Sequence, residues 1–334
     1  MEIPYLNMLT VPIRRTQAIF HPEQYHGWGK TERYFEGWYY KVVNATEDKA
    51  FAFIFGIAME KTDIHQAFIQ VLDGKMATSE YHKFDIQEFS PNPKHFEVRL
   101  GKNLFLTDKI QLDLPTVTGE LKFNHQVSWP NRWYSPGIMG PFSFVPFMEC
   151  YHGILSMDHV IQGSLTVQGE TIDFTDGRGY MEKDWGRSFP SGYIWMQSNH
   201  FTESGISVKA SVAKIPWLGS SFVGFIAGVW LHDRLIEFTT YNFTKLRKSF
   251  ADQEKVEVVM ENGNYRLELL ASRSVATQLA SPILGFMDGR IEESMTSQIE
   301  VMLFDKKSGQ MLLHDVGRNA ALEVAGNIEE IFVL

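Results

Sequence analysis

The feature that most constrains this chain is an internal repeat whose offset is nearly half the chain's own length. Residues 37–44 align with residues 192–199 at an offset of 155 in a chain of 334 residues, and the next apolar run continues the match without a gap. Solenoid repeats have periods of about 20–50 residues, so this offset indicates a duplicated domain. A chain of this length also exceeds what one hydrophobic core usually serves. We therefore predict two similar domains, residues 20–185 and 186–334.

Each copy is a series of short apolar segments separated by turn residues. In the first copy these segments are residues 51–57, 67–72, 96–100, 110–114, 120–123 and 162–167. Dipeptides typical of hairpin turns punctuate both copies: Asp73-Gly74, Gln168-Gly169, Asp176-Gly177, Asn262-Gly263 and Ser308-Gly309. Long amphipathic helical patterns are scarce, and the aromatic content of 13% suits pleated strands. The pattern predicts an all-β fold of two tandem lipocalin-like antiparallel β-barrel domains related by internal duplication.

Composition narrows the class of partner and the compartment. The formal net charge is −9 and no basic run occurs, which argues against a nucleic-acid partner. Cys150 is the only cysteine, so no internal disulfide can form. Residues 1–17 lack an apolar run of signal-peptide length, and the longest apolar stretches are too short to cross a bilayer as helices. We expect a cytoplasmic protein.

Residues 129–150 depart from the strand pattern. This segment holds four prolines together with several aromatic residues, and prolines exclude a central strand or a regular helix. Two interpretations stay open: an ordered loop that crosses a barrel mouth, or a plug of packed aromatic side chains without a ligand.

Two segments carry unusual mixtures of polar and aromatic residues. Alternate residues of a strand share a face. In the first segment that face holds Glu36, Trp38 and Tyr40, and in the matching strand it holds Tyr193, Trp195, Gln197 and Asn199. Unpaired polar groups are costly in a dry core. Such a face suits the inside of a barrel that holds an apolar ligand.

Simpler explanations compete with this one. Trp and Tyr in strands usually pack in a core, and Glu36 can pair with Lys41 or Arg33. The run from Glu182 to Gly186 is harder to explain structurally, because three consecutive charges lie between aromatic flanks where the first copy meets the second.

Metal and nucleotide motifs are absent from the sequence. There is no P-loop, no His-Glu-x-x-His, no paired Cys-x-x-Cys and no Gly-x-Ser-x-Gly. Glu149, His152, Asp158 and His159 are neighbours in the sequence, but chance clusters of this kind in turns are commoner than metal sites. We predict neither a metal nor a cofactor.

At the aromatic and charged segments the sequence resembles the tocopherol cyclase family. The matching elements are residues 35–41 (FEGWYYK), 135–140 (SPGIMG), 146–153 (PFMECYHG), 180–186 (YMEKDWG), Phe189-Pro190 and the spaced Trp195, Gln197 and Asn199. The resemblance runs in order over roughly residues 20–330. More distantly the sequence is similar to the carotenoid hydratases, which share the tandem lipocalin-like architecture.

The resemblance implies chemistry on an isoprenoid double bond. Tocopherol cyclases close a chromanol ring from a prenylated hydroquinone, and the hydratases add water to a similar alkene. Both start by protonating carbon, which needs an acid in a water-poor pocket and aromatic faces beside the cation. We predict the proton donor to be Glu182 or Asp184, with Glu36 accepting the phenol proton or positioning the head group. The predicted ligand contacts are Gln197 and Asn199 on the ring oxygens, and Trp38, Tyr40, Trp185 and Trp195 around the cation.

Three functions therefore compete. The first is an enzyme without a cofactor that acts on a prenyl lipid, either a cyclase of the intramolecular lyase (isomerase) type or a hydratase, and makes transient contact with a membrane surface. The second is a non-catalytic carrier of isoprenoid lipid in two barrels. The third, a carbohydrate-active protein with paired carboxylates, is weakest because nothing in the sequence indicates an open polar cleft.

Overall fold

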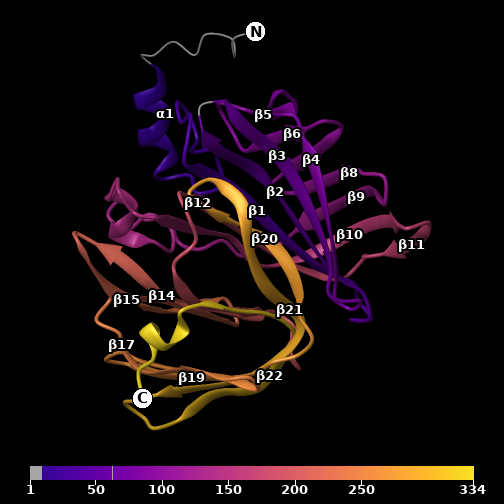
Figure 1. Cartoon of the computed structure of the whole chain (residues 1–334). Coiled ribbons are helices and arrows are strands. Elements are labelled where there is room, and N and C mark those ends of the chain that lie inside the picture. Colours follow the sequence, from indigo (N-terminus) through magenta and orange to yellow (C-terminus); the bar gives the residue numbers. More distant parts are fainter. Residues whose placement is uncertain (1–9, 62) are drawn as a thin grey trace.

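The structure is a computed structural model that describes residues 10–61 and 63–334. Residues 1–9 of the N-terminal segment discussed above lie outside the described residues. Nearly all regular structure is β-strand, arranged in two large antiparallel sheets (Figure 1). The strands of the first sheet are β1 (Tyr34–Val43), β2 (Ala50–Lys61), β3 (Ile64–Asp73), β4 (Thr78–Phe84), β5 (Phe89–Pro91), β6 (Glu97–Leu100), β7 (Asn103–Leu106), β8 (Lys109–Asp113), β9 (Val117–Asn124), β10 (Cys150–Val167), β11 (Glu170–Asp173) and β12 (Arg178–Gly186).

The second sheet follows the first along the chain. Its strands are β13 (Gly192–Ser198), β14 (Ile206–Trp217), β15 (Ser220–Leu231), β16 (Arg234–Thr239), β17 (Lys245–Ala251), β18 (Lys255–Glu261), β19 (Tyr265–Ser272), β20 (Thr277–Ile283), β21 (Phe286–Asp305) and β22 (Met311–Gly326). The helical elements are α1 (Thr10–Ala18) and the short 3-10 turns η1 (Ile86–Glu88), η2 (Gly140–Phe144) and η3 (Ile328–Ile331). In the described part of the chain, no helix has both the length and the apolar character that a bilayer crossing requires.

The two sheets repeat one strand order. In the first, β4, β3, β2 and β1 are followed by β12, β10 and then β9 back to β5, while β11 pairs only with β10. In the second, β16, β15, β14 and β13 are followed by β22, β21 and then β19 back to β17, while β20 pairs only with β21. The shared order confirms the predicted all-β fold with two related halves. The domain boundary at residue 185 stays a prediction.

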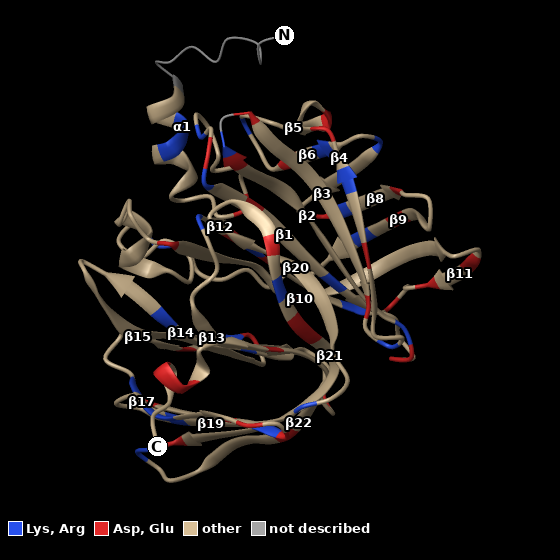
Figure 2. Cartoon of the chain, in the orientation of Figure 1, with Lys and Arg blue, Asp and Glu red and all other residues tan. Residues whose placement is uncertain are grey.

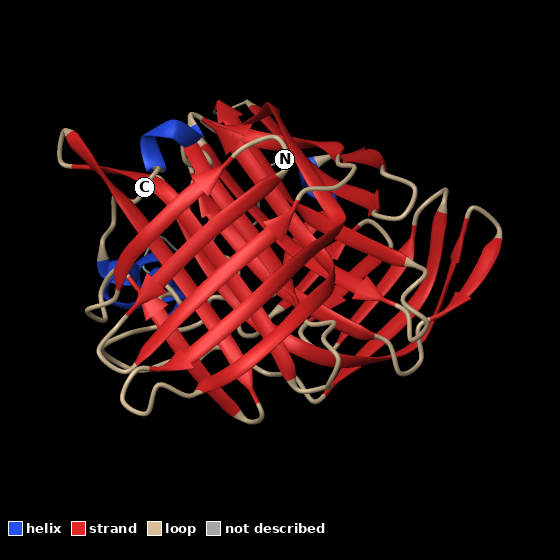
Figure 3. Ribbon diagram, turned by 90° about the horizontal axis from the view of Figure 1, so that it is seen from below, coloured by secondary structure: helices blue, strands red, loops and turns tan. Residues whose placement is uncertain are grey.

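Both sheets are strongly curled, but their end strands do not pair within the described residues. The hydrogen-bonded path of the first sheet ends at β4 and β5, and that of the second ends at β16 and β17. In each case the two end strands follow each other in the chain, separated only by residues 85–88 or 240–244. A connection this short forces the sheet to bend until its ends are near each other. Each sheet is therefore a barrel-like curl that is not closed, with helices confined to the margin (Figure 3).

Each curled sheet is filled by its own apolar side chains. The first interior contains Trp38, Tyr40 and Phe55, all fully buried, and the Trp38 and Phe55 rings stack with their centroids 5.2 Å apart. The second contains Met196, Phe238 and the other buried residues of its own cluster. A third apolar cluster joins the two sheets to each other. The prediction that a ligand occupies a barrel interior therefore does not fit the structure.

The gapless repeat alignment fails by one residue on the first strand of each half. It matches Trp38 with Tyr193, but Trp38 points into the first interior whereas Tyr193 points into the cluster between the sheets. Residues that share a face, such as Tyr39 and Trp195, are instead 156 apart. A one-residue change of register moves every side chain of a strand to the other face, so the alignment placed the predicted polar faces on opposite sides.

Residues 129–150 connect β9 to β10 and lie against both sheets. Phe142, in η2, packs edge-on against Trp217 of β14 and also contacts Tyr241. Ile138 and Met148 are buried, while Trp133 is 81% exposed. The segment is thus an ordered loop, as one of the two interpretations predicted, but it bridges the two sheets.

Candidate active site

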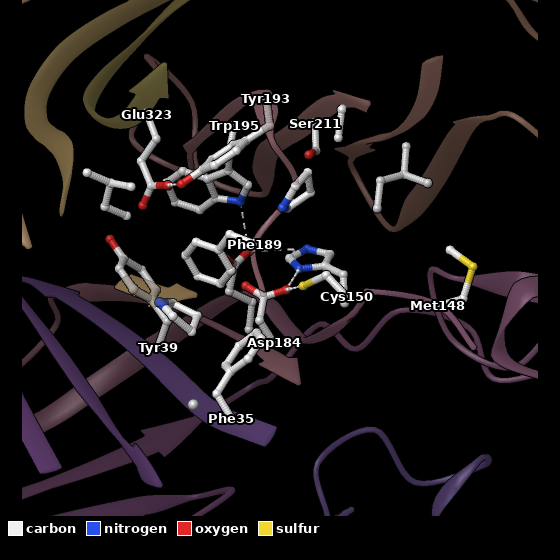
Figure 4. Close-up of a pocket in the computed structure, with 18 of the residues that line it drawn as sticks. Phe35, Tyr39, Met148, Cys150, Asp184, Phe189, Tyr193, Trp195, Ser211 and Glu323 are labelled. Carbon is white, nitrogen blue, oxygen red and sulfur yellow. Dashed lines mark hydrogen bonds and ion pairs between the residues drawn. The ribbon is translucent and has the colours of Figure 1, made fainter. Parts of the chain in front are cut away.

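A cavity of about 180 Å³ lies between the two sheets (Figure 4). Its walls come from the outward faces of the first sheet, from the facing strands of the second sheet and from the loop before β10. Apolar side chains form most of the lining: Phe35, Ile54, Phe68, Met139, Phe142, Met148, Phe189, Ile215, Phe222, Phe225, Ile226, Leu279, Met287 and Ile291. A few titratable groups interrupt this lining, a composition typical of small-molecule sites.

Glu182 of β12 is the most deeply buried acid of the first sheet on this wall, at 5% exposed. Tyr180 donates its hydroxyl proton to Oε2 of Glu182 at 2.5 Å, and the indole N–H of Trp195 donates to the same oxygen at 3.0 Å. Burial raises the pKa of Glu182 above its ordinary value; His152 opposes this shift, and the neighbouring Asp184 adds to it. A carboxyl group in such surroundings can hold a proton at a pH where exposed glutamates are ionised.

His152 and Asp184 form a second functional unit beside this acid. Nδ1 of His152, on β10, lies 2.8 Å from Oδ1 of Asp184, on β12. Nε2 of His152 lies 3.5 Å from Oε2 of Glu182, close enough for attraction if the imidazole is charged, but it makes no hydrogen bond with any described residue. A carboxylate on Nδ1 fixes that nitrogen as the donor and leaves Nε2 able to take up a proton. The wall therefore places a base next to an acid.

The opposite wall carries a second pair of buried acids. Glu323 of β22 lines the cavity and accepts the hydroxyl proton of Tyr193 at 2.6 Å. Glu293 of β21 is its register partner, and Tyr39 donates to Oε1 of Glu293 at 2.5 Å. Oε2 of Glu293 has no hydrogen-bond partner among the described residues. Figure 4 shows Tyr39, Tyr193 and Glu323 gathered around one side of the cavity.

The charges of this second pair are strongly perturbed. Burial raises the pKa of Glu293 to about 7, even though the Tyr39 hydroxyl and the Lys41 ammonium both act to lower it. Burial and then the adjacent Glu293 raise the pKa of Glu323 well above its ordinary value. Two neighbouring carboxyls in a dry site cannot both ionise readily, so the pair retains at least one proton near neutral pH.

Comparison with known proteins gives this geometry a family. The sequence profile of the family described as tocopherol cyclase-like matches residues 105–326. The chain belongs to this family. A rice protein (Oryza sativa subsp. japonica) named "Probable tocopherol cyclase, chloroplastic" is 25% identical over 193 residues, which are 54% of this chain and 40% of the rice protein. The chain thus matches well under half the length of that curated relative.

Solved structures share the fold at low sequence identity. The crystal structure of CghA with Sch210972 superposes with a TM-score of 0.56 at 11% identity, covering 88% of each chain. A Nitrosomonas europaea protein described as "a putative AttH" superposes with a TM-score of 0.51 at 15% identity, covering 88% of this chain and 93% of its own. At these identities the likeness establishes the two-part β architecture alone.

Three of the residues predicted from the sequence line the cavity of this family member. They are Glu182, Asp184 and Trp195. The family motif at residues 180–186 lies within β12, and its Glu182 and Asp184 side chains line the cavity. Asp184 is engaged by His152, which makes it a group that orients a base and leaves Glu182 as the carboxyl suited to donating a proton.

Four other predicted residues lie on the faces of β1 and β12 that point away from this cavity. Trp38 and Tyr40 pack in the first interior, Trp185 packs against that interior and stacks on His26, and Glu36 is fully buried beside them. Burial alone would raise the pKa of Glu36, but Lys183 and His26 outweigh it and hold the pKa below its ordinary value.

Glu36 is fixed by a set of close partners. The Lys183 ammonium lies 2.5 Å from Oε1, the His26 backbone N–H donates at 2.8 Å and the Tyr34 hydroxyl donates at 2.6 Å. This carboxylate is paired, fully hydrogen-bonded and absent from the cavity lining. The structure therefore does not bring Glu36 together with Glu182 and Asp184, and its contact with a ligand stays a prediction.

Gln197 and Asn199 share the Trp195 side of the second sheet but lie beyond the cavity. The side-chain oxygen of Gln197 accepts a hydrogen bond from the Lys41 ammonium at 2.9 Å. The side-chain amide of Asn199 donates to Asp158 at 2.9 Å and to the Gly179 carbonyl at 2.8 Å. Both residues tie the two sheets together, although Nε2 of Gln197 and Oδ1 of Asn199 are buried without a hydrogen-bond partner among the described residues.

Several groups that surround the cavity were not predicted from the sequence. His152 lies inside the family motif at residues 146–153, but it drew attention only as a weak metal candidate. Tyr39 lies between Trp38 and Tyr40 on β1, so its side chain points to the opposite face from the residues that were predicted. Glu293 and Glu323 escaped notice, although a single glutamate within the apolar run 320–325 is itself a signal of a buried acid.

The metal cluster considered from the sequence does not assemble. Asp158 pairs with Arg178, and His159 hydrogen-bonds Ser156 at 3.1 Å. A different set, His152 with Glu182 and Asp184, places one ligand atom each within 4.8 Å of one another. In that set Oε2 of Glu182 already accepts hydrogen bonds from Tyr180 and Trp195. The hydrogen bond between His152 and Asp184 also fits a role in proton transfer.

Proposed function

We propose that this protein is an enzyme that protonates a carbon–carbon double bond of an isoprenoid lipid and traps the resulting cation with an oxygen. Ring closure by an internal hydroxyl would make it an isomerase of the tocopherol cyclase type, and capture of water would make it a hydratase. The name of the rice relative supports the cyclase form. The observation that carries the proposal is a buried acid, Glu182, facing an apolar cavity beside a His–Asp pair.

The first step uses Glu182 as the proton donor. Its carboxyl O–H bond breaks, the proton joins the less substituted alkene carbon, and a tertiary cation forms on the neighbouring carbon. The rings of Trp195 and Tyr39, with centroids 5.6 Å apart, offer electron-rich faces for that cation. Few polar groups compete for the cation in so apolar a lining, which favours its survival until the oxygen attacks.

The second step uses His152 as the base. The hydroxyl oxygen of the ligand, or a water, bonds to the cation and releases its proton to Nε2 of His152. Asp184 stabilises the imidazolium through Nδ1. Because Nε2 lies 3.5 Å from Oε2 of Glu182, the proton can return to the carboxylate and restore the donor. The cycle consumes no proton and uses side chains alone.

The opposite wall serves the head group. Glu323 retains a proton as part of its pair with Glu293, so it can donate a hydrogen bond to a second oxygen of the ligand. In this scheme His152 replaces Glu36 as the proton acceptor, and Glu323 replaces Gln197 and Asn199 as the contact to the ring oxygen.

The test is turnover of a prenylated hydroquinone in D2O. Ring closure by this route leaves one deuterium on carbon that does not wash out, so the chromanol product gains one mass unit. E182Q should lower the turnover rate by about 10²–10⁴-fold while the Kd for the lipid changes less than about threefold. D184N should also lower turnover, since the imidazole loses its fixed tautomer. E292Q, an exposed neighbour of Glu293, is the matched control.

Other outcomes separate the alternatives. Wild-type turnover in E182Q together with loss in E323Q would contradict the donor assignment and transfer it to the other wall. Tight lipid binding without product in the wild type would favour the carrier function instead.

A further inference from the structure

A second cavity of about 500 Å³ adjoins the first. It lies between the region of α1, residues 30–34 and the loop before β10. Met148 and His152 line both cavities, so the two spaces share a wall. Met148 and His152 are thus the side chains that a ligand spanning both cavities would have to pass.

The second cavity is strongly basic. Its lining includes four cations, Arg15, Lys30, Arg33 and Arg187, against a single carboxylate, Glu32. Across residues 10–61 and 63–334, none of the four cations forms an ion pair within 4.0 Å of a carboxylate. Figure 2 shows the charged positions of α1 and of the adjoining segments on one side of the molecule. This local excess stands out in a chain whose net charge is −9.

The cations also disfavour one another. Burial lowers the pKa of Lys30, and the charges of Arg15 and Arg187 lower it further. Burial raises the pKa of Glu149, which is not part of the cavity lining, and the charge of Arg187 opposes that shift. All four side chains are exposed to solvent, which weakens their mutual repulsion, and a bound anion would relieve what remains.

Aromatic rings face the same space. Tyr151 and Trp185 stack with centroids 5.5 Å apart, and Phe144 and Phe147 complete the apolar side of the cavity. A lining that combines cations with aromatic rings suits an amphiphile, because it can hold a charged group and the start of its chain together.

We infer that this second cavity binds the anionic end, a phosphate or a carboxylate, of an amphiphile whose apolar chain reaches toward the first cavity. The inference concerns binding alone and goes beyond the proposed function, since it holds whether or not the ligand is turned over.

The test compares two ligands that differ only in charge, farnesyl phosphate and farnesol, by isothermal titration calorimetry of the full chain at low salt. Farnesyl phosphate should bind roughly tenfold more tightly, an advantage of the size expected for one or two charge-assisted hydrogen bonds, and the advantage should shrink as salt is added. The double variant K30Q/R187Q should abolish the advantage and leave the farnesol Kd unchanged. K122Q, on the exposed face of β9, is the control.

Two further measurements identify the source of the anion. Saturable binding of inorganic phosphate would support a site that recognises free phosphate. K30Q/R187Q should abolish that binding. Sedimentation with phosphatidylglycerol vesicles but not with phosphatidylcholine vesicles, again lost in K30Q/R187Q, would assign the site to a lipid headgroup. Equal Kd values for the two farnesyl ligands, or a phosphate advantage that survives K30Q/R187Q, would overturn the inference. Turnover by E182Q is irrelevant to these readouts, so failure here and failure of the proposed reaction are distinguishable.

Discussion

Replacing Glu293 by Gln should change how the stability of the protein depends on pH. Glu293 is 1% exposed, and burial raises the pKa of its carboxyl from 4.5 to about 7. Glutamine imitates the protonated acid, since it keeps an oxygen that can accept the 2.5 Å hydrogen bond from Tyr39. The variant therefore holds the site permanently in the uncharged form.

The sign and size follow from proton binding in the two states. Between pH 4.5 and pH 7 the folded protein keeps this proton while the unfolded chain has lost it, so the free energy of unfolding of the wild type falls as pH rises. A shift of this size corresponds to roughly 3 kcal/mol over the whole window. The free energy of unfolding of the variant does not fall in this way, because glutamine does not titrate. Relative to the wild type, E293Q should gain about 2–3 kcal/mol of stability between pH 5 and pH 8.

Urea unfolding at pH 5, 6, 7 and 8, followed by tryptophan fluorescence, measures the difference. E292Q on the exposed face of the same strand should show no such trend. The control matters because any loss of negative charge alters stability slightly in an acidic protein. A stability difference between E293Q and the wild type that stays constant from pH 5 to pH 8 would refute the claim that Glu293 holds a proton in the folded state.

Three other substitutions test which side chains line the cavity and which are packed away from it. Trp38→Ala should destabilise the protein by about 3–5 kcal/mol in urea unfolding, yet leave lipid affinity within about twofold, because Trp38 packs in the first interior and not on the cavity wall. Glu36→Gln should cost about 3–5 kcal/mol by leaving the Lys183 ammonium buried without its carboxylate, and adding Lys183→Met should recover part of that loss; no recovery would show that the ion pair is not the cause. Lys209→Met removes a buried cation that lowers the pKa of Glu182, so the alkaline limb of the pH–activity profile should move to higher pH; an unmoved limb would exclude Glu182 as the group that sets it.

The sequence predicted strands and turns well because both are local properties. Residues 51–57, 67–72 and 110–114 fall on β2, β3 and β8, and the turns at Asp73-Gly74 and Asn262-Gly263 connect consecutive strands. The repeat predicted two halves, and their matching strand orders confirm this. Local signals of this kind report backbone preferences, which do not depend on how one sheet packs against the other.

The site was harder to predict because its strands are buried on both faces. In β1 every residue except Gly37 is buried, so alternation of polar and apolar residues carried no information about which face borders a cavity. The choice of Glu36, Trp38 and Tyr40 over Tyr39 rested on polarity. That polarity belongs to the enclosed ion pair of Glu36 with Lys183. A buried charge pair and a catalytic acid look alike in one sequence, and only the packing of neighbouring strands separates them.

Duplication explains why acids meet between the sheets. Glu182 lies on the last strand of the first sheet and is the register partner of Tyr39, while Glu323 lies on the last strand of the second sheet and is the register partner of Trp195. Tyr39 and Trp195 are themselves 156 residues apart, the offset that keeps equivalent faces together. The two acids thus occupy equivalent positions in the two sheets. Both line the cavity that lies between the sheets. In a single copy such a carboxyl would be exposed to water, and its pKa would return to the ordinary range. Packing of the second copy against the first buries the carboxyl, raises its pKa and so keeps it protonated and able to donate.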